Sequence, residues 1–340
     1  MSESVVTADT PLTPREIERE AKQFQETVAA IRAELRKVII GQDAVIARLI
    51  MGLFLQGHVL LEGLPGLAKT LLLKSLSRVL NLEFKRIQFT PDLMPADIIG
   101  TRILQQEGAA VSFTFERGPV FTNLLLADEI NRASPKTQSA LLEAMQEWQV
   151  TTAGTTTPLP RPFMVLATQN PIEMEGTYPL PEAQLDRFLF KLDVPYPDQL
   201  ELVEIALRTT GAPGEEPQIV VESAASLRRW MDLIRRIPVA RPILDYCAKI
   251  VLATHPDTDS ELARKYIRFG ASPRGMQALV LAAKARAFLL GRATVVRDDV
   301  IDVANSCLSH RIILNFDAEG EGIRISGLVE QLLRQVRLYA

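Results

Sequence analysis

Apolar residues recur through residues 16–38 at the spacing of an amphipathic helix, with charged residues between them. Further along the chain, short continuous apolar runs occupy residues 58–61, 124–127 and 163–167, and each ends in a polar or glycine-rich turn. Such runs are typical of strands that are buried on both faces of a parallel sheet. Helical periodicity separates the runs, so the alternation predicts a doubly wound α/β domain.

Two segments interrupt this alternation of strands and helices. Residues 93–115 contain two glycines and an alternating stretch at 110–115, which predicts a hairpin arm inserted into a βα unit. Residues 149–157 are rich in β-branched residues around Gly154. They predict a second hairpin, directly before the third buried strand.

A domain boundary is predicted at Pro195 and Pro197, because Asp198 and Glu201 directly after them match a helix-starting capping box. Beyond this point the chain is expected to be all-helical. The predicted helices span residues 200–208, 224–237, 242–254, 273–290, 298–311 and 326–338. The expected division is a disordered polar tail at 1–14, an α/β domain at 15–196 and a smaller helical domain at 197–340.

Composition supports a folded protein without a strong global charge. A chain of 340 residues with 47% hydrophobic residues can bury a large core and fits two domains. Lys and Arg number 38 and Asp and Glu number 41, so the formal net charge of -3 predicts no global attraction to nucleic acid or to a membrane surface. The longest apolar run, residues 49–61, is too short to span a bilayer, and no membrane insertion is expected.

The cysteines and histidines predict neither a disulfide framework nor a metal site. Cys247 and Cys307 lie in apolar helix-like stretches without metal-ligand spacing, and we interpret them as core residues. His58, His255 and His310 are scattered along the chain and are interpreted as structural. The first 14 residues match no targeting peptide, so a cytoplasmic protein is expected.

Residues 63–70 (GLPGLAKT) follow a predicted strand and open a predicted helix, where backbone N–H groups can surround a triphosphate. Lys69 would reach the β- and γ-phosphates, and the Thr70 hydroxyl would bind Mg²⁺. The usual pattern has glycine where Ala68 stands, and alanine suffices if that position needs no positive φ. The alternative is a simple glycine–proline turn with an exposed lysine. The predicted nucleotide-binding residues of this loop are Gly63, Pro65, Gly66, Leu67, Ala68, Lys69 and Thr70.

Polar side chains follow the next two buried strands at the points where these strands end. Ligands of open α/β folds bind at the carboxyl edge of the sheet. Asp128 would therefore hold Mg²⁺ through water, and Glu129 would polarise the water that attacks the γ-phosphate. Asn170 could orient the same water through hydrogen bonds. The alternatives are an acidic surface turn and an ordinary Asn-Pro turn.

Arg187 lies at the end of a short helix that Pro181 starts, just before a further predicted strand at 188–192. It could complement transition-state charge, an effect worth about 10³- to 10⁵-fold in rate. The alternative is a surface salt bridge to Asp186 or Glu182, worth at most about 1 kcal/mol.

Arg274 is placed in the first turn of a predicted helix, after Ser272 and Pro273. A cation at this position opposes the helix dipole, which predicts that Arg274 faces an anion, with phosphate as the candidate. The alternative is a solvated arginine that tolerates a small cost.

The candidate residues follow one another along the chain in the order of the Walker A, Walker B, sensor 1, arginine finger and sensor 2 elements of AAA+ ATPases. They are the loop at 63–70, Asp128 with Glu129, Asn170, Arg187 and Arg274. The chain closely resembles the MoxR family within that superfamily, over roughly residue 31 to the end. The segments that carry this resemblance are 38–42 (VIIGQ), 63–70 (GLPGLAKT), 115–121 (FERGPVF), 127–133 (ADEINRA) and 167–171 (ATQNP). Alanine at position 68 is shared with the MoxR pattern, so it becomes a marker of this family.

The resemblance implies a P-loop AAA+ core followed by a helical lid, with a helix-2 insert at 93–115 and a hairpin before sensor 1 at 149–157. It implies Mg²⁺-dependent ATP hydrolysis in a ring, usually a hexamer, in which Arg187 acts on the neighbouring subunit's nucleotide. Gly41 and Gln42 would lie near adenine. MoxR ATPases are thought to be chaperone-like remodellers of protein complexes, often with von Willebrand factor A domain partners.

Two other functions are compatible with the same motifs. A nucleic-acid motor needs Lys or Arg in its hairpins, but residues 149–157 have neither and residues 93–115 have only Arg102, which favours a protein client. A nucleotide-gated scaffold with little turnover would have no use for Glu129, Asn170 or Arg187.

Overall fold

A computed structural model describes residues 14–64, 66–107, 110–152, 154–170, 176–211 and 214–338. The tail expected to be disordered falls on residues 1–14, of which all but Pro14 lie outside the described residues. Within the described parts, none of the helices combines the length and the hydropathy needed to cross a membrane.

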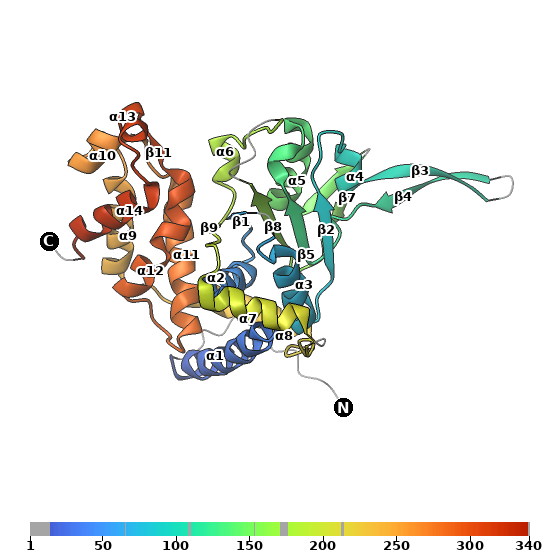
Figure 1. Cartoon of the computed structure of the whole chain (residues 1–340), viewed down its shortest axis with the longest axis horizontal. Coiled ribbons are helices and arrows are strands. Elements are labelled where there is room, and N and C mark those ends of the chain that lie inside the picture. The colour runs from blue at the N-terminus through green and yellow to red at the C-terminus, as the bar shows by residue number, and fades with distance from the viewer. Residues whose placement is uncertain are drawn as a thin grey trace.

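The α/β part is built on a parallel five-stranded sheet with the order β2-β5-β8-β1-β9 (Figure 1). Its strands are β1 (Val59–Glu62), β2 (Phe84–Gln88), β5 (Leu124–Asp128), β8 (Met164–Gln169) and β9 (Phe190–Asp193). The predicted α/β class is confirmed. The β2 strand was not predicted, because a strand at the edge of the sheet carries polar residues and lacks the continuous apolar run of its neighbours.

Successive residues of the central strands pack into two different cores. Leu124 and Leu126 join one cluster, whereas Leu125 and Ala127 join the other, as the period of two along a strand requires. The first cluster is covered by α1 (Pro14–Arg36), α2 (Asp43–Phe54) and α3 (Lys69–Val79). The second is covered by α4 (Pro95–Ile99) and α5 (Pro135–Glu147). Burial on both faces explains why these strands are continuously apolar.

Both predicted hairpins are present. Strands β3 (Gly100–Glu107) and β4 (Ala110–Arg117) pair antiparallel and project from the domain as a long arm (Figure 1). Strands β6 (Gln149–Thr152) and β7 (Thr155–Pro158) form the second hairpin. The two hairpins are joined by a bond from Arg102 Nη2 to Thr155 Oγ1 at 2.7 Å.

The region after the sheet contains the six predicted helices and additional short elements. The predicted ones are α7 (Gln199–Thr210), α8 (Ala224–Arg236), α9 (Arg241–Ala253), α11 (Pro273–Leu289), α12 (Arg297–Leu308) and α14 (Ile325–Gln335). The expectation of an all-helical region was wrong, because β10 (Ile267–Phe269) and β11 (Ile313–Leu314) pair antiparallel. These strands, like α10 (Glu261–Tyr266) and α13 (Phe316–Gly320), are too short to produce a periodic pattern.

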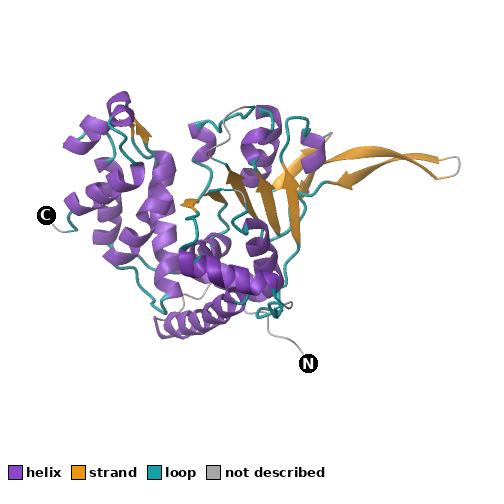
Figure 2. Cartoon of the chain, viewed as in Figure 1, coloured by secondary structure: helices purple, strands orange, loops and turns teal. Residues whose placement is uncertain are grey.

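Helix α1 packs against both the sheet region and the helical region (Figure 2). It packs against α3 on one side and α11 on the other. The ring of Phe24 lies 4.7 Å from that of Phe54 in α2 and 4.9 Å from that of Phe288 in α11, as centroid distances. The first core cluster is therefore continuous from the sheet into the helical region.

Candidate functional site

The loop between β1 and α3 contains two described residues with left-handed backbone conformations. Gly66 has a φ of 83° and Ala68 a φ of 55°. Position 68 thus needs a positive φ after all, which costs an alanine about 1–2 kcal/mol compared with glycine. Pro65 lies outside the described residues. The loop closes on itself, since Lys69 Nζ donates to the Gly63 carbonyl at 2.6 Å.

A cavity of about 420 Å³ opens beside this loop, at the carboxyl ends of β1, β5 and β8. It brings the loop together with Asp128, Glu129 and Asn170, as the sequence predicted. The residues that line it are Gly63, Gly66, Leu67, Ala68, Lys69, Thr70, Leu71, Arg86, Gln88, Asp128, Glu129, Thr168, Gln169 and Asn170. Burial lowers the pKa of Lys69, while the negative charges of Asp128 and Glu129 act in the opposite direction. We call this space the phosphate cavity.

Both carboxylate oxygens of Asp128 are engaged by protein donors. Oδ1 accepts from Thr168 Oγ1 at 2.6 Å, and Oδ2 accepts from Arg86 Nη2 at 2.7 Å. Because both Asp128 oxygens already accept a hydrogen bond, this carboxylate is better suited to contact a cation through water than to coordinate it directly. Oxygen donors of this kind, with the Thr70 hydroxyl on the same cavity wall, are the ligands that Mg²⁺ prefers.

Glu129 is held in a strained conformation. Its φ of 56° and ψ of 50° are left-handed, an arrangement that costs about 1–3 kcal/mol and is concentrated at functional sites. Its backbone N–H donates to Thr168 Oγ1 at 2.9 Å. Its Oε2 accepts from Gln88 Nε2 at 2.8 Å and from Arg132 Nη1 at 3.1 Å. The carboxylate is therefore fixed from two sides, at the rim of the phosphate cavity.

Gly41 and Gln42 border the loop, and neither is among the described residues that line the phosphate cavity. Gln42 Nε2 donates to the Leu67 carbonyl at 3.1 Å, which ties this segment to the loop. Gly41 has a φ of 74°, and a Cβ there would lie 2.0 Å from Glu201 Oε1. The positive φ therefore favours glycine, and any other residue would also have to displace the Glu201 carboxylate.

Arg187 and Arg274 lie away from the phosphate cavity and close to each other. Both line a second cavity of about 270 Å³, together with Arg235 and Arg311, between the end of α2 and the helices α8 and α11. Arg187 Nη1 donates to the Leu142 carbonyl at 3.0 Å, and its buried Nε has no partner among the described residues. We call this space the arginine cavity.

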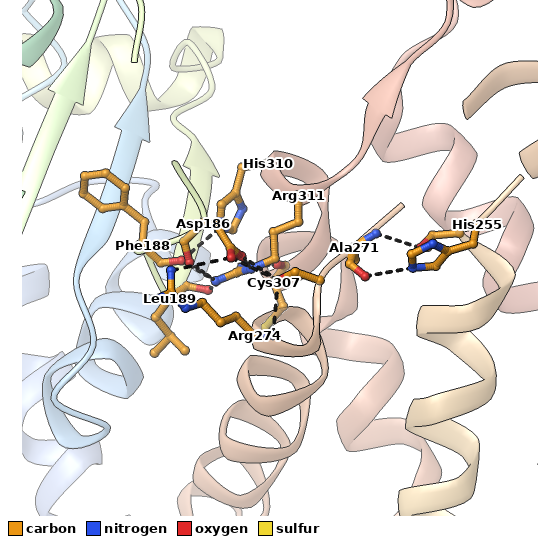
Figure 3. A network of polar contacts seen from close by, with 11 residues as sticks. Asp186, Phe188, Leu189, His255, Ala271, Arg274, Cys307, His310 and Arg311 are labelled. Atoms are coloured by element: carbon orange, nitrogen blue, oxygen red, sulfur yellow. Dashed lines mark hydrogen bonds and ion pairs between the residues drawn. The ribbon is translucent and has the colours of Figure 1, made fainter. Parts of the chain in front are cut away.

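The anion that Arg274 faces in this chain is a carboxylate. Its Nη1 lies 3.8 Å from Asp186 Oδ2, and half of the side chain is exposed (Figure 3). The sequence placed the positive charge of Arg274 against the helix dipole, and the Asp186 carboxylate compensates this charge within the protein. Because half of the Arg274 side chain is exposed, part of its guanidinium can still contact a further anion.

The histidines and cysteines are absent from the described lining of the phosphate cavity, whereas His58 lines the arginine cavity and His310 contacts Arg311. Burial raises the pKa of the Cys247 and Cys307 thiols to about 12, as for inert core residues. Burial lowers the pKa of His58 to about 4, and it lowers that of His310 well below its ordinary value. The described residues contain no cluster of three or more His, Cys, Asp or Glu side chains that could hold a metal.

Comparison with known proteins agrees with this geometry. Residues 58–190 match the ATPase family associated with various cellular activities (AAA), and residues 259–332 match the AAA lid domain. The chain is 46% identical to Chaperone MoxR1 of Mycobacterium tuberculosis, over 90% of this chain and 80% of that protein. It is 32% identical to Protein MoxR of Paracoccus denitrificans, over 83% and 87% of the two chains.

The chain belongs to the MoxR family of AAA+ ATPases. A crystal structure from Cytophaga hutchinsonii, provisionally assigned as an ATPase, matches with a TM-score of 0.88 and 43% identity, over 95% of this chain and 98% of that one. This MoxR-family chain is thus an ATPase, with the AAA+ core and helical lid of its family.

Sequence reasoning missed several residues of both cavities in this MoxR-family fold. Arg86 and Gln88 lie on β2, whose pairing with β5 places Gln88 opposite Asp128. Thr168 stands in the segment ATQNP that carried the family resemblance, but its hydroxyl was given no role. A search for polar residues at the ends of the predicted strands would have found Thr168, but not Gln88, because β2 was not predicted. Arg311 could not be found in this way, because its partner lies 125 residues earlier in the chain.

Proposed function

We propose that this MoxR-family ATPase binds ATP with Mg²⁺ in the phosphate cavity and uses hydrolysis to remodel protein clients as a chaperone-like machine. The convergence of Lys69, Asp128 and Glu129 on one cavity at the carboxyl edge of the sheet carries this proposal. Lys69 holds the β- and γ-phosphates, and Asn170 orients the attacking water. Glu129 takes up the proton of that water as it attacks.

The cation is assigned to Thr70 and Asp128. The Thr70 hydroxyl would hold Mg²⁺, and Asp128, whose two oxygens already accept hydrogen bonds, would contact it through water. When bound, the cation neutralises charge on the phosphate oxygens. Arg86 pairs with Asp128, with its Nη2 2.7 Å from Oδ2, and so holds this carboxylate in place.

The proposed machine is a ring of like subunits, with a hexamer as the form that the family resemblance implies, and the location of the two arginines supports it. Arg187 and Arg274 share the arginine cavity and do not reach the phosphate cavity of their own chain. We assign both to the nucleotide of the neighbouring subunit, where they complement the charge of the transition state. Arg274 thereby acts in trans together with Arg187.

The hairpin arm favours a protein client over nucleic acid. Leu104 and Phe113 are paired across its strands, and both side chains are more than half exposed. Arg102 is bonded to Thr155 of the second hairpin. An arm with apolar and few basic groups suits an unfolded or loosely folded polypeptide, whereas a phosphate track needs cations. The chaperone name of the Mycobacterium tuberculosis relative points the same way. A von Willebrand factor A domain partner and a cytoplasmic site of action complete the proposal.

Steady-state phosphate release from the wild type, Glu129→Gln and Lys69→Ala tests the assignment. Glu129→Gln should bind ATP with unchanged affinity but lose turnover by about 10²-fold or more, because a general base is missing. Lys69→Ala should lose nucleotide affinity. Wild-type turnover by Glu129→Gln would refute the mechanism, and tight salt-sensitive binding of labelled DNA would refute the choice of client.

A further inference from the structure

Arg311 makes a buried ion pair across the junction between the sheet region and the helical region. It ends the short 3₁₀ helix η2 (Ser309–Arg311), and its Nε donates to Asp186 Oδ1 at 2.7 Å (Figure 3). The Arg311 side chain is 3% exposed and that of Asp186 18% exposed. Asp186 directly precedes Arg187 in the chain.

The same guanidinium also binds the backbone on both sides of Arg187. Nη2 donates to the carbonyls of Asp186 at 3.0 Å and of Phe188 at 2.7 Å. Nη1 donates to the Leu189 carbonyl at 3.4 Å and to the carbonyl of Cys307 in α12. One side chain from the helical region therefore fixes the turn at residues 186–189, which includes Arg187.

Asp186 extends this network to Arg274. Its carboxylate accepts from Ser272 Oγ at 3.0 Å, and that hydroxyl accepts the backbone N–H of Arg274 at 3.2 Å. Asp186 and Arg311 thus hold the turn of Arg187 and the first turn of α11 in one fixed arrangement (Figure 3).

We propose that Arg311 is a positioning residue that aims Arg187 and Arg274 at the nucleotide of the neighbouring subunit. The inference rests on the proposed role of these two arginines in trans. Arg187 has a single carbonyl partner, and its Nε has none among the described residues, so few side-chain contacts orient it. The backbone turn that carries this side chain is held by Arg311. If Arg311 only attached the helical region to the sheet region, it would not need to bind the carbonyls on both sides of Arg187.

Arg311→Lys tests the geometry while it keeps the charge. A lysine presents a single compact ammonium, which cannot bind the Asp186 carboxylate and two carbonyls together as the planar guanidinium does. We expect kcat to fall about 10- to 100-fold, because a small misplacement of a catalytic group is costly. KM and the dissociation constant for a fluorescent ATP analogue should stay within about twofold, since this network contains no residue of the phosphate cavity.

Arg286→Lys is the matched control. Arg286 pairs with Asp299 and Asp302 inside the helical region and does not contact residues 186–189. Its kcat should stay within about twofold of the wild type. Should Arg311→Lys fail to fold, as judged by its melting temperature, Asp186→Asn carries the same test, since it removes the charge that Arg311 binds.

Mixed rings separate positioning from a purely structural role. A Glu129→Gln subunit has an inactive site but an intact Arg187, so adding it should restore turnover to Arg187→Ala subunits and equally to Arg311→Lys subunits. Mixing Arg311→Lys with Arg187→Ala should restore nothing. Rescue of Arg187→Ala without rescue of Arg311→Lys, or wild-type kcat in Arg311→Lys, would overturn this inference alone. Absence of rescue for Arg187→Ala would overturn the role in trans, and the inference with it.

Discussion

Thr168 connects the two acidic residues of the phosphate cavity. Its hydroxyl donates to Asp128 Oδ1 and accepts the backbone N–H of Glu129, and the residue is almost fully buried. Thr168→Val keeps the shape and removes both bonds, so Glu129 loses support for its left-handed backbone. We expect kcat to fall about tenfold and the free energy of unfolding to fall by about 1–3 kcal/mol.

Phosphate-release assays and urea unfolding measure these two effects. Thr168→Ser keeps the hydroxyl and should recover most of both losses. Unchanged turnover in Thr168→Val would show that the two acidic residues hold their positions without this link.

The ring of His58 makes the stability depend on pH. Nε2 lies 3.0 Å from the Met145 carbonyl, and Nδ1 lies 3.0 Å from the Val165 nitrogen, so the neutral ring donates at one end and accepts at the other. Burial lowers the pKa of His58 from 6.5 to about 4. Between these values the unfolded chain binds more protons, so stability falls as the pH falls. The loss from pH 8 to pH 5 should be about 2 kcal/mol.

Urea unfolding of the wild type and His58→Gln at pH 8, 6.5 and 5 measures this contribution. The glutamine variant is expected to be less stable overall but to lose about 2 kcal/mol less on acidification. The burial of His310 acts in the same direction in both proteins and cancels in the comparison. Parallel pH curves for the two proteins would contradict the low pKa of His58.

At the scale of elements, the apolar pattern predicted the buried strands and the longer helices but missed the edge strand and the shortest helices and strands. The buried strands and the helices of 11 residues or more in the helical region follow from their apolar patterns. The edge strand β2 was missed, and with it Arg86 and Gln88, because it lacks a continuous apolar run. Its place beside β5 is set by the order of strands in the sheet, which no sequence pattern shows. The sequence motifs could therefore predict Lys69, Asp128 and Glu129. The residues that hold them in place could not be predicted in this way, because they are brought there by the order of strands in the sheet.

Helix α1 is predicted to hold the sheet region and the helical region together. Phe24 is 1% exposed and packs edge-on against Phe54, with Trp230 and Phe288 beside it. Phe24→Ala should lower the free energy of unfolding by about 3–5 kcal/mol, because it leaves a cavity where these elements meet. Urea unfolding followed by tryptophan fluorescence measures this, with Phe24→Leu as the smaller change. Equal stability of the two variants would show that the helix is not a shared support.

For the whole molecule, the charge of the arginine cavity predicts how assembly depends on nucleotide. Arg187, Arg235, Arg274 and Arg311 line this cavity, with Asp186 as the only carboxylate among the described lining residues. Positive charges in one cavity repel each other, and an anion bound between them offsets this repulsion. In the proposed ring that anion is the nucleotide of the neighbour, so bound ATP should strengthen the contact between subunits.

Sedimentation velocity of Glu129→Gln, which is expected to retain ATP, tests this expectation. With ATP the protein should sediment as a ring, and without nucleotide the subunits should dissociate at about tenfold higher protein concentration, an effect of about 1.4 kcal/mol per contact. Arg274→Ala should remove most of the effect of ATP, since its half-exposed guanidinium can meet a further anion. Arg241→Ala is the control, because this arginine is largely exposed on α9 and pairs locally with Asp245. Assembly that is equally tight with and without nucleotide would mean that the neighbour's phosphates do not enter the arginine cavity.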